Sequence, residues 1–364
     1  MTTAADVTVR PFEDRDRARL AEVADRAFAR TERVSFDPEK GHTLVAEAGG
    51  EVIGGAVLRH VDVAGQRVGF TDWIFADPDR AVPGTGSLLR DAALEWFDEA
   101  GTDETIARID AANSASQELH RRGGYQPLPF REQIRRWGRR LPGIYLKGHG
   151  IVDTGLRMWV RDAGAPRVPP ASRLAATWGV NVLLLAVVSV RAPREITTLA
   201  AALVWLPLIA LVLLGLRESA LRGVARARGL TLAHVPWPGG AVGVGLPVAA
   251  IFGGWAPMFG SSVPDEPGWR YERDLHALAI AHVAAGAVVA GVAWLTVLWD
   301  PGGGLPWTDI RRAATTFALL DLVPFARVYG NSGRVVHDRS AGWWAALAAA
   351  GAGPMVLVIA GWAV

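Results

Sequence analysis

The sequence predicts an α+β domain, with helices flanking a mixed sheet, followed by an all-α polytopic transmembrane domain. Up to about Ser172, charged and apolar residues interleave as in a globular protein, whereas later apolar runs reach the ~20 residues that cross a bilayer. The opening stretch MTTAADVTVRPFEDRDR is polar and has no apolar core, so we do not expect a signal peptide. We expect a first domain over residues 1–145, a linker over 146–172 and a transmembrane domain over 173–364.

Composition excludes several kinds of chemistry. The chain has no cysteine, so it has no disulfide, no thiolate metal ligand and no cysteine nucleophile. Its formal net charge is only +2, and many of its arginines flank the apolar runs. That distribution favours orientation in a membrane over nucleic-acid binding, so no nucleic-acid partner is expected.

The second half of the chain contains six apolar segments. Buried helices of a large soluble domain are the alternative, but they would need polar stripes that these segments mostly lack. One segment, 241–260, is rich in Gly and Pro, and a re-entrant course there would leave five spans and move the C-terminus to the other side. The segments are about 174–190, 195–216, 241–260, 275–298, 313–328 and 341–364.

Arginines near these segments predict a cytoplasmic N-terminal domain, because basic residues accumulate on the cytoplasmic side of membrane proteins. We therefore expect an integral protein of the cell membrane, in contact with the lipid bilayer. The basic groups that lie on this side are Arg135, Arg136, Arg139, Arg140 and Lys147, then Arg217, Arg222, Arg226 and Arg228, then Arg311 and Arg312. Those on the opposite side, which weaken the bias, are Arg191, Arg194, Arg327, Arg334 and Arg339.

In the first half, hydrophobic periodicity predicts an alternation of strands and helices. The expected strands are Val7–Arg10, a hairpin of Thr43–Ala48 and Glu51–His60, Val68–Phe75, Thr105–Asp110, and a last strand pair around Pro129–Trp137. The expected helices are Asp14–Arg30, Gly86–Ala100 and Ser114–Arg122.

The strand-to-helix turn FADPDRAVPGTGSLL, Phe75 to Leu89, has the composition of an anion-binding turn. Unpaired amides at the positive end of a helix bind anions, and glycine allows close approach. With the order of elements, this turn resembles the GNAT family of N-acetyltransferases. The resemblance implies acetyl-CoA as cofactor. It departs where Ala81 and Val82 replace the family's usual residues and where Pro83 removes an N–H donor. The implied cofactor-binding residues are Phe75, Arg80, Gly84, Thr85, Gly86, Ser87 and Asn113.

A second motif, NSASQELHRRGGY from Asn113 to Tyr125, resembles the helix before the last hairpin of the same family. His120 stands where the family often has a tyrosine that protonates the departing CoA thiolate, and a histidine is able to do this. The resemblance implies direct acetyl transfer to a small-molecule or protein amine, with His120, Asn113 and Asp72 as catalytic residues. Glu47 is a second candidate base. A surface histidine and solvated carboxylates are the alternative interpretations.

Two segments of the membrane half resemble the zinc motifs of site-2 proteases. Leu216–Gly240 retains the motif's glutamate as Glu218, but Arg217 and Leu221 occupy its two histidine positions. Leu319–Val336 retains Asp321, Pro324 and Gly330, whereas Tyr329 stands at the position of the ligand aspartate. His276 and His282 do not share a helical face, and His234 and His337 lie in predicted loops. The resemblance implies a pseudoprotease, and no metal site is expected.

These two resemblances lead to two functional hypotheses of different classes. The first is a membrane-tethered N-acetyltransferase that acts on an amine at the cytoplasmic face. The second is a non-catalytic regulatory membrane protein, whose protease-like bundle holds a transmembrane partner and whose front domain binds CoA or a protein. An active intramembrane protease is rejected because the zinc ligands are replaced.

Overall fold

The chain forms two compact units, seen here in a computed structural model: residues 1–150 with 156–167, and residues 151–155 with 168–364. The residues that the structure describes are 6–28, 36–111, 113–149, 156–164, 170–191, 204–264, 269–299, 306–324 and 331–361.

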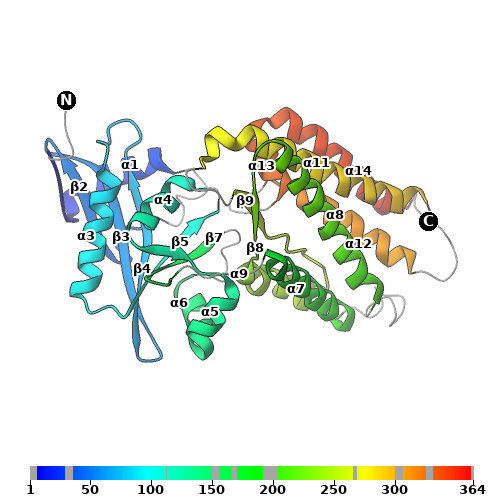
Figure 1. Cartoon of the computed structure of the whole chain (residues 1–364), viewed down its shortest axis with the longest axis horizontal. Helices are drawn as coiled ribbons and strands as arrows, with labels where there is room; N and C mark the ends of the chain where they lie inside the picture. The colour runs from blue at the N-terminus through cyan, green and yellow to red at the C-terminus, as the bar shows by residue number, and fades with distance from the viewer. Residues whose placement is uncertain are drawn as a thin grey trace. The chain divides into compact units, whose positions relative to one another are not determined.

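The first unit is built on a seven-stranded mixed sheet in the order β1-β2-β3-β4-β5-β7-β6 (Figure 1). Only β4 and β5 pair in parallel, and the other neighbours pair antiparallel. The strands are β1 Val7–Pro11, β2 His42–Ala48, β3 Glu51–Val63, β4 Gln66–Ala76, β5 Glu104–Asp110, β6 Tyr125–Pro127 and β7 Leu156–Arg161. The helices are η2 Asp14–Asp16, α1 Arg17–Ala27, α3 Thr85–Glu99, α4 Ser114–Arg122, α5 Phe130–Trp137, η3 Gly138–Arg140 and α6 Leu141–Lys147.

Side chains alternate between the two faces of this sheet, and each face carries its own core. Leu44 and Ala46 of β2 pack in a cluster with Leu89, Ala93 and Phe97 of α3. The intervening Val45 instead packs in a cluster with Leu20, Val23 and Ala24 of α1. Helices α3 and α1 therefore cover opposite faces. The expected α+β architecture, with helices flanking a mixed sheet, is confirmed.

The end of the sheet differs from the expectation. Residues 130–137, expected as a strand pair, form helix α5, with Gln133 and Trp137 buried one turn apart. Trp137 Nε1 donates to Glu104 Oε2 at 2.7 Å, and Tyr145 Oη of α6 donates to Gln133 Oε1 at 2.7 Å. The last strand is β7, which pairs with both β5 and β6. The sheet thus extends into residues 146–172, where we expected a linker.

The second unit is helical, with one short hairpin. Three of its helices, over Ser172–Val190, Tyr271–Leu298 and Ala341–Ile359, are long and apolar enough to cross a membrane. The remaining expected segments include charged positions, shorter helices or residues outside the described ranges. The helices are α7 Pro170–Arg191, α8 Leu206–Ala227, α9 Pro238–Gly240, η5 Ala241–Gly245, α10 Leu246–Phe252, α11 Tyr271–Leu298, α12 Trp307–Asp321, α13 Ser332–Arg339 and α14 Ala341–Ile359, and the hairpin strands are β8 Leu232–Val235 and β9 Ser261–Pro264.

Segment 241–260 is helical only as far as Phe252, and Gly253 ends it in the left-handed conformation with φ +64°. Helix α12 has 15 residues, fewer than the ~20 that a span normally requires. Both segments therefore lack the length of a regular spanning helix in the residues that the structure describes. The re-entrant course considered for 241–260 stays a prediction.

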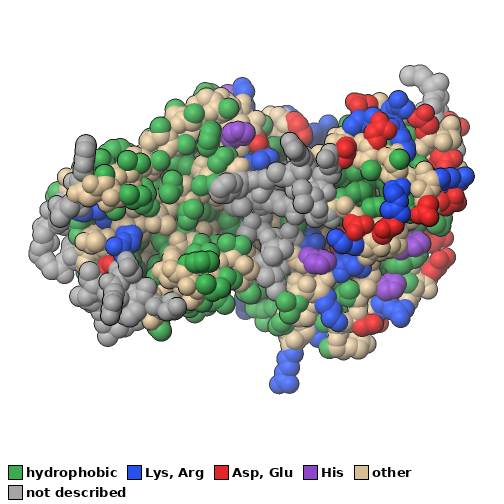
Figure 2. Space-filling model, turned by 180° about the vertical axis from the view of Figure 1, so that it is seen from behind, with side chains coloured by type: hydrophobic (Ala, Val, Ile, Leu, Met, Phe, Trp, Pro, Cys, Tyr) green, Lys and Arg blue, Asp and Glu red, His purple; other side chains and the backbone are tan. Residues whose placement is uncertain are grey.

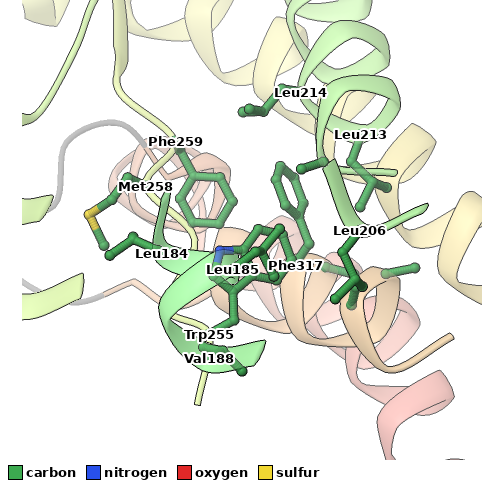
Figure 3. Close-up of a cluster of buried hydrophobic side chains, with 14 of the residues drawn as sticks. Leu184, Leu185, Val188, Leu206, Leu213, Leu214, Trp255, Met258, Phe259 and Phe317 are labelled. Atoms are coloured by element: carbon green, nitrogen blue, oxygen red, sulfur yellow. The ribbon is translucent and has the colours of Figure 1, made fainter. Parts of the chain in front are cut away.

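The helical unit has an apolar core and an apolar surface. In the core, Leu184 and Leu185 of α7 and Leu213 of α8 lie in one buried cluster with Phe259 and Phe317 (Figure 3). On the outside, Leu183, Val190, Leu298 and Ile359 are each more than half exposed. Figure 2 shows hydrophobic side chains gathered over this unit, whereas acidic and basic side chains gather over the first unit. A surface of this kind suits contact with lipid.

Candidate active site

Strands β4 and β5 part in the middle of the sheet. Their parallel pairing runs from Val68 and Glu104 to Thr71 and Ala107 and then ends, although β4 continues to Ala76 and β5 to Asp110. The backbone groups that face each other beyond Thr71 are not paired across the two strands. Such an opening at the carboxyl ends of parallel strands offers backbone donors and acceptors to an extended ligand.

A β-bulge marks the point where the strands part. Thr71 pairs with Leu58 of β3 and Trp73 pairs with Val57, so Asp72 is the extra residue. The carboxylate of Asp72 is held by Arg59 in a bidentate pair, with distances of 2.8 Å from Nε to Oδ2 and 3.1 Å from Nη2 to Oδ1. Both oxygens are thereby engaged. Asp72 lies where the strands part, and both of its carboxylate oxygens hold Arg59; its catalytic role stays a prediction.

The predicted phosphate turn leads from β4 into α3. Gly84 caps the helix with φ +100°, a left-handed conformation that favours glycine. The N–H groups of Ser87 and Leu88 both donate to the Gly84 carbonyl. For the N–H groups of Gly84 and Gly86 themselves, no hydrogen bond is recorded among the described residues. Two free donors beside the positive end of a helix suit a phosphate group.

The side chains of two other residues of this turn have structural contacts. The Thr85 side chain is buried, and its hydroxyl donates to the Val82 carbonyl at 2.7 Å, so it closes the turn from inside. The Arg80 guanidinium pairs with Glu51 at 2.5 Å. Ser87 is half-buried. The candidate phosphate-binding cradle is therefore formed by the backbone N–H groups of Gly84 and Gly86. The side chains at positions 80 and 85 are engaged elsewhere.

Asp77, which the sequence analysis missed, anchors this turn. Its carboxylate is fully buried and accepts from Arg19 Nη2 at 3.0 Å and from Arg26 Nη2 at 2.7 Å, both from α1. Its Oδ1 also accepts from the Asp79 N–H, and its own N–H donates to the Ile53 carbonyl. A signal was present: arginines seven residues apart share a helix face, and an aspartate follows the strand directly.

The helix that follows β5 brings His120 close to the turn. A Cβ added at Gly86 of α3 would meet the Leu119 methyl groups at 3.7 and 3.8 Å, and Arg90 Nη1 donates to the Leu119 carbonyl at 3.0 Å. Asn113 caps α4, since its Oδ1 accepts from the Ser116 N–H at 2.9 Å. Asn113 and His120 thus sit on the helix that packs beside the predicted phosphate turn.

His120 is almost wholly buried, with 2% of its surface exposed. Its Nδ1 lies 2.8 Å from the Ser116 carbonyl, so Nδ1 carries the proton, and the ring packs edge-on to Tyr125. Burial lowers the pKa of the imidazole, which is therefore neutral at pH 7 with Nε2 unprotonated. In this state His120 has no proton on Nε2 to give to a thiolate.

The side chains of two more predicted residues are engaged elsewhere: Glu47 pairs with β1, and the Phe75 ring lies in the core. Glu47 of β2 is paired with Arg10 of β1, with Oε2 2.9 Å from Nε. The Phe75 side chain is buried against Phe28 and Phe36, at ring-centroid distances of 5.0 and 5.3 Å. Trp73 joins the same aromatic group, 4.8 Å from Phe28. The backbone of Phe75 pairs with Gly55 of β3, and its ring helps to form an aromatic wall beside β4.

Comparison with known proteins gives one family match. Residues 8–125 match the profile of the family described as "Acetyltransferase (GNAT) family". The first unit has a GNAT-like fold. The search of curated proteins found no match.

Solved structures similar to the chain include several acetyltransferases, and the three that follow align with about a third of it. The glucosamine N-acetyltransferase region of a fungal multi-domain GH3 β-N-acetylglucosaminidase is 20% identical, covers 33% of this chain and 17% of that one, and has a TM-score of 0.30. The ribosomal-protein-S18-alanine N-acetyltransferase from Escherichia coli is 18% identical over 33% and 78%, with a TM-score of 0.29. A GNAT family acetyltransferase from Elizabethkingia anophelis with acetyl-CoA bound is 14% identical over 34% and 77%, with a TM-score of 0.28.

In the second unit, the two segments singled out for protease-like motifs meet at a buried ion cluster. Arg217 of α8 is fully buried, and its Nη1 lies 2.9 Å from Glu218 Oε1 while its Nε lies 3.0 Å from Asp321 Oδ1 of α12. Ser262 Oγ donates to Glu218 Oε2 at 2.8 Å. Leu221 is buried in the apolar core, and Tyr329 lies outside the described residues. The Arg217 guanidinium thus bridges the two carboxylates, and Arg222 Nε lies 3.3 Å from Glu218 Oε2 as a second cation.

No group of three or more His, Asp or Glu side chains suited to a metal occurs in the described ranges. His282 is buried beside Ser332, with 3.4 Å between Nδ1 and Oγ, whereas His276 accepts from Arg339 at 3.2 Å. His234 lies on β8 rather than in a loop, and His337 lies on α13. The histidines of the second unit are therefore distributed over several separate contacts.

Proposed function

We propose that the first unit transfers an acetyl group from acetyl-CoA to an amine, at the cytoplasmic face of the membrane in which the second unit is embedded. The observation that carries this proposal is the parting of β4 and β5 beside a turn with two free N–H groups. An extended pantetheine arm suits the unpaired strand edges, and the pyrophosphate suits Gly84 and Gly86.

The reaction joins the acceptor nitrogen to the acetyl carbonyl carbon and breaks the thioester C–S bond. The amine loses a proton and the CoA sulfur takes one, so the step needs positioning and proton transfer but no covalent enzyme intermediate. The bulge at Asp72 places backbone next to the opening, and Arg59 holds Asp72 there. His120 and Asn113 belong to this proposal as residues of the adjoining helix.

The aromatic wall supports an apolar or amphiphilic acceptor. Phe28, Phe36, Trp73 and Phe75 make four edge-to-face contacts along the carboxyl half of β4. An amine with an apolar body would gain contact area there, and attachment to the bilayer raises the local concentration of amphiphilic molecules. Small-molecule and protein amines are both compatible with this wall.

The absence of cysteine makes the test direct. Purified full-length protein is given acetyl-CoA and a panel of amphiphilic and peptide amines, and the released CoA thiol is measured with a thiol reagent that meets no protein thiol. Amine-dependent thiol release, with mass-spectrometric detection of the acetylated amine, supports the proposal. Calorimetry that shows no acetyl-CoA binding contradicts it.

A second candidate is favoured by the buried Arg217 cluster. We infer that the helical unit is a pseudoprotease-like bundle, in which a fixed cation stands where a catalytic metal would be needed, and that it holds a transmembrane partner without cutting it. In that case the front unit binds CoA as a sensor. Acetyl-CoA binding without thiol release, together with a membrane protein that co-purifies in fixed stoichiometry, is the result that distinguishes this function from the first.

A further inference from the structure

The helical insertion between β6 and β7, residues 130–149, is strongly basic. It contains six basic residues and one acidic residue, whereas the whole chain has a formal net charge of +2. Its elements are α5, η3 and α6. The insertion has a structural role at its base, where Trp137 and Tyr145 are buried, but its charges lie elsewhere on the helices. The basic residues are Arg131, Arg135, Arg136, Arg139, Arg140 and Lys147.

Two of these six side chains pair with carboxylates, and two more, Arg140 and Lys147, donate to backbone carbonyls. The single acidic residue, Glu132, pairs with Arg135, and Arg136 pairs with Glu104 of β5. Arg131 and Arg139 are exposed, and no ionic partner is recorded for either in the described part of the chain. Their positions predict an anionic ligand outside the protein.

Exposed apolar side chains accompany these charges. Ile134 is 48% exposed and Leu146 is 63% exposed, and no other large hydrophobic residue of the first unit is as exposed in the ranges described. An element that combines arginines with protruding Leu and Ile side chains has the composition of a helix that lies in a membrane interface. Binding to nucleic acid or to a purely acidic protein surface would not require the exposed leucine and isoleucine.

We propose that this insertion, Phe130–Lys147, docks the first unit on the bilayer surface by binding anionic lipid headgroups and inserting Ile134 and Leu146 at the interface. The proposal rests on the membrane attachment in the proposed function. The first candidate span begins at Ser172, 11 positions after the end of β7 at Arg161. Because a chain reaches at most ~3.6 Å per residue, the sheet stays within a few nanometres of the lipid.

The test uses the full-length chain in nanodiscs. Leu146→Cys introduces the only cysteine, which is labelled with an environment-sensitive fluorophore. We expect roughly a two-fold or greater rise in emission, with a blue shift, when phosphatidylglycerol is added to phosphatidylcholine nanodiscs. About 0.5 M salt should reverse the rise, since it screens the headgroup charge. Glu95→Cys on α3, which is also exposed, is the labelling control and should not respond.

A charge variant distinguishes electrostatic docking on anionic lipid from mere closeness of the insertion to the bilayer. Arg131→Gln, Arg135→Gln and Arg139→Gln together, in the Leu146→Cys background, should abolish the response to phosphatidylglycerol while circular dichroism stays unchanged. An equal signal in both lipids, or a response that survives the three substitutions, overturns the proposal. So does a signal that appears only when an acidic protein or RNA is added. The readout needs no acetyl-CoA, so failure of acetyl transfer would leave this result unaffected.

Discussion

His120 shows how burial alone limits what a side chain is able to do. Its Nδ1–H is committed to the Ser116 carbonyl, and its lowered pKa disfavours the imidazolium that would be needed to donate from Nε2. In the proposed reaction, the proton for the CoA sulfur is therefore expected from another group that reaches the opening. His120 remains a residue that fixes α4 beside the turn.

The first prediction separates these two roles. If His120 fixes α4, His120→Gln should lower kcat by less than about ten-fold, whereas loss of a general acid typically costs about 10²- to 10⁴-fold. The measurement is kcat and KM for thiol release from pH 6 to 9. The Glu118→Gln variant on the exposed side of α4 serves as control, and a fall of a thousand-fold with a lost limb of the pH profile would restore the acid role.

The same burial predicts a pH dependence of stability. The folded-state pKa of His120 lies below its value in the unfolded chain. Between these two pKa values the unfolded state therefore binds more protons than the folded state. Stability from this group is present above the unfolded pKa of about 6.5 and is lost as pH falls through the folded pKa. Hydrogen exchange of α4, corrected for intrinsic rates, should accelerate between pH 7 and 5, and His120→Gln should reduce this change. An unchanged profile in the variant would assign the effect to other groups.

At the scale of elements, the two ends of α3 offer a matched pair of glycines, Gly84 before the helix and Gly101 after it. Gly84 and Gly101 both have positive φ, at +100° and +63°, and an added Cβ meets no atom at Gly101. Alanine at either position costs about 1–2 kcal/mol of backbone strain. Only Gly84→Ala should also weaken acetyl-CoA binding, because it shifts the N–H groups of the cradle. Calorimetry should show at least about a ten-fold higher Kd for Gly84→Ala and little change for Gly101→Ala; equal effects would contradict the cradle.

Local periodicity predicted the elements whose burial alternates cleanly, and failed where charge dominated. Leu44, Val45 and Ala46 alternate between two cores, so β2 is evident from the sequence. Residues 130–137 combine aromatic residues with arginines, and they become a helix because Gln133 and Trp137 pack one turn apart. The partners that decide this, Glu104 and Tyr145, are distant in sequence. The ion pair between Arg59 and Asp72 could not be predicted from the sequence either, because the two residues meet only through the pairing of β3 with β4.

At the scale of the whole molecule, the apolar unit encloses charges that its sequence alone does not explain. Arg217 and Asp321 are 104 positions apart, and their ion pair joins α8 to α12. Glu218 extends the cluster to the hairpin through Ser262. The two segments that resemble protease motifs were each identifiable in the sequence. Their meeting through an arginine was not, because it depends on the packing of helices far apart in the chain.

The buried ion cluster leads to the last prediction. Arg217→Met leaves Asp321 without its cation and leaves Glu218 with Arg222 alone, at 3.3 Å, which should destabilise the helical unit by about 3–5 kcal/mol. The measurement is the temperature at which the purified protein loses its monodisperse elution peak. Arg226→Met, at an exposed position of the same helix, should have little effect. The triple variant Arg217→Met, Glu218→Gln, Asp321→Asn removes all three charges and should recover most of the loss, since the cost arises from unpaired charge rather than from the missing arginine. If the triple variant is no more stable than Arg217→Met, the arginine stabilises the bundle by packing against Phe259 and not by neutralising Glu218 and Asp321.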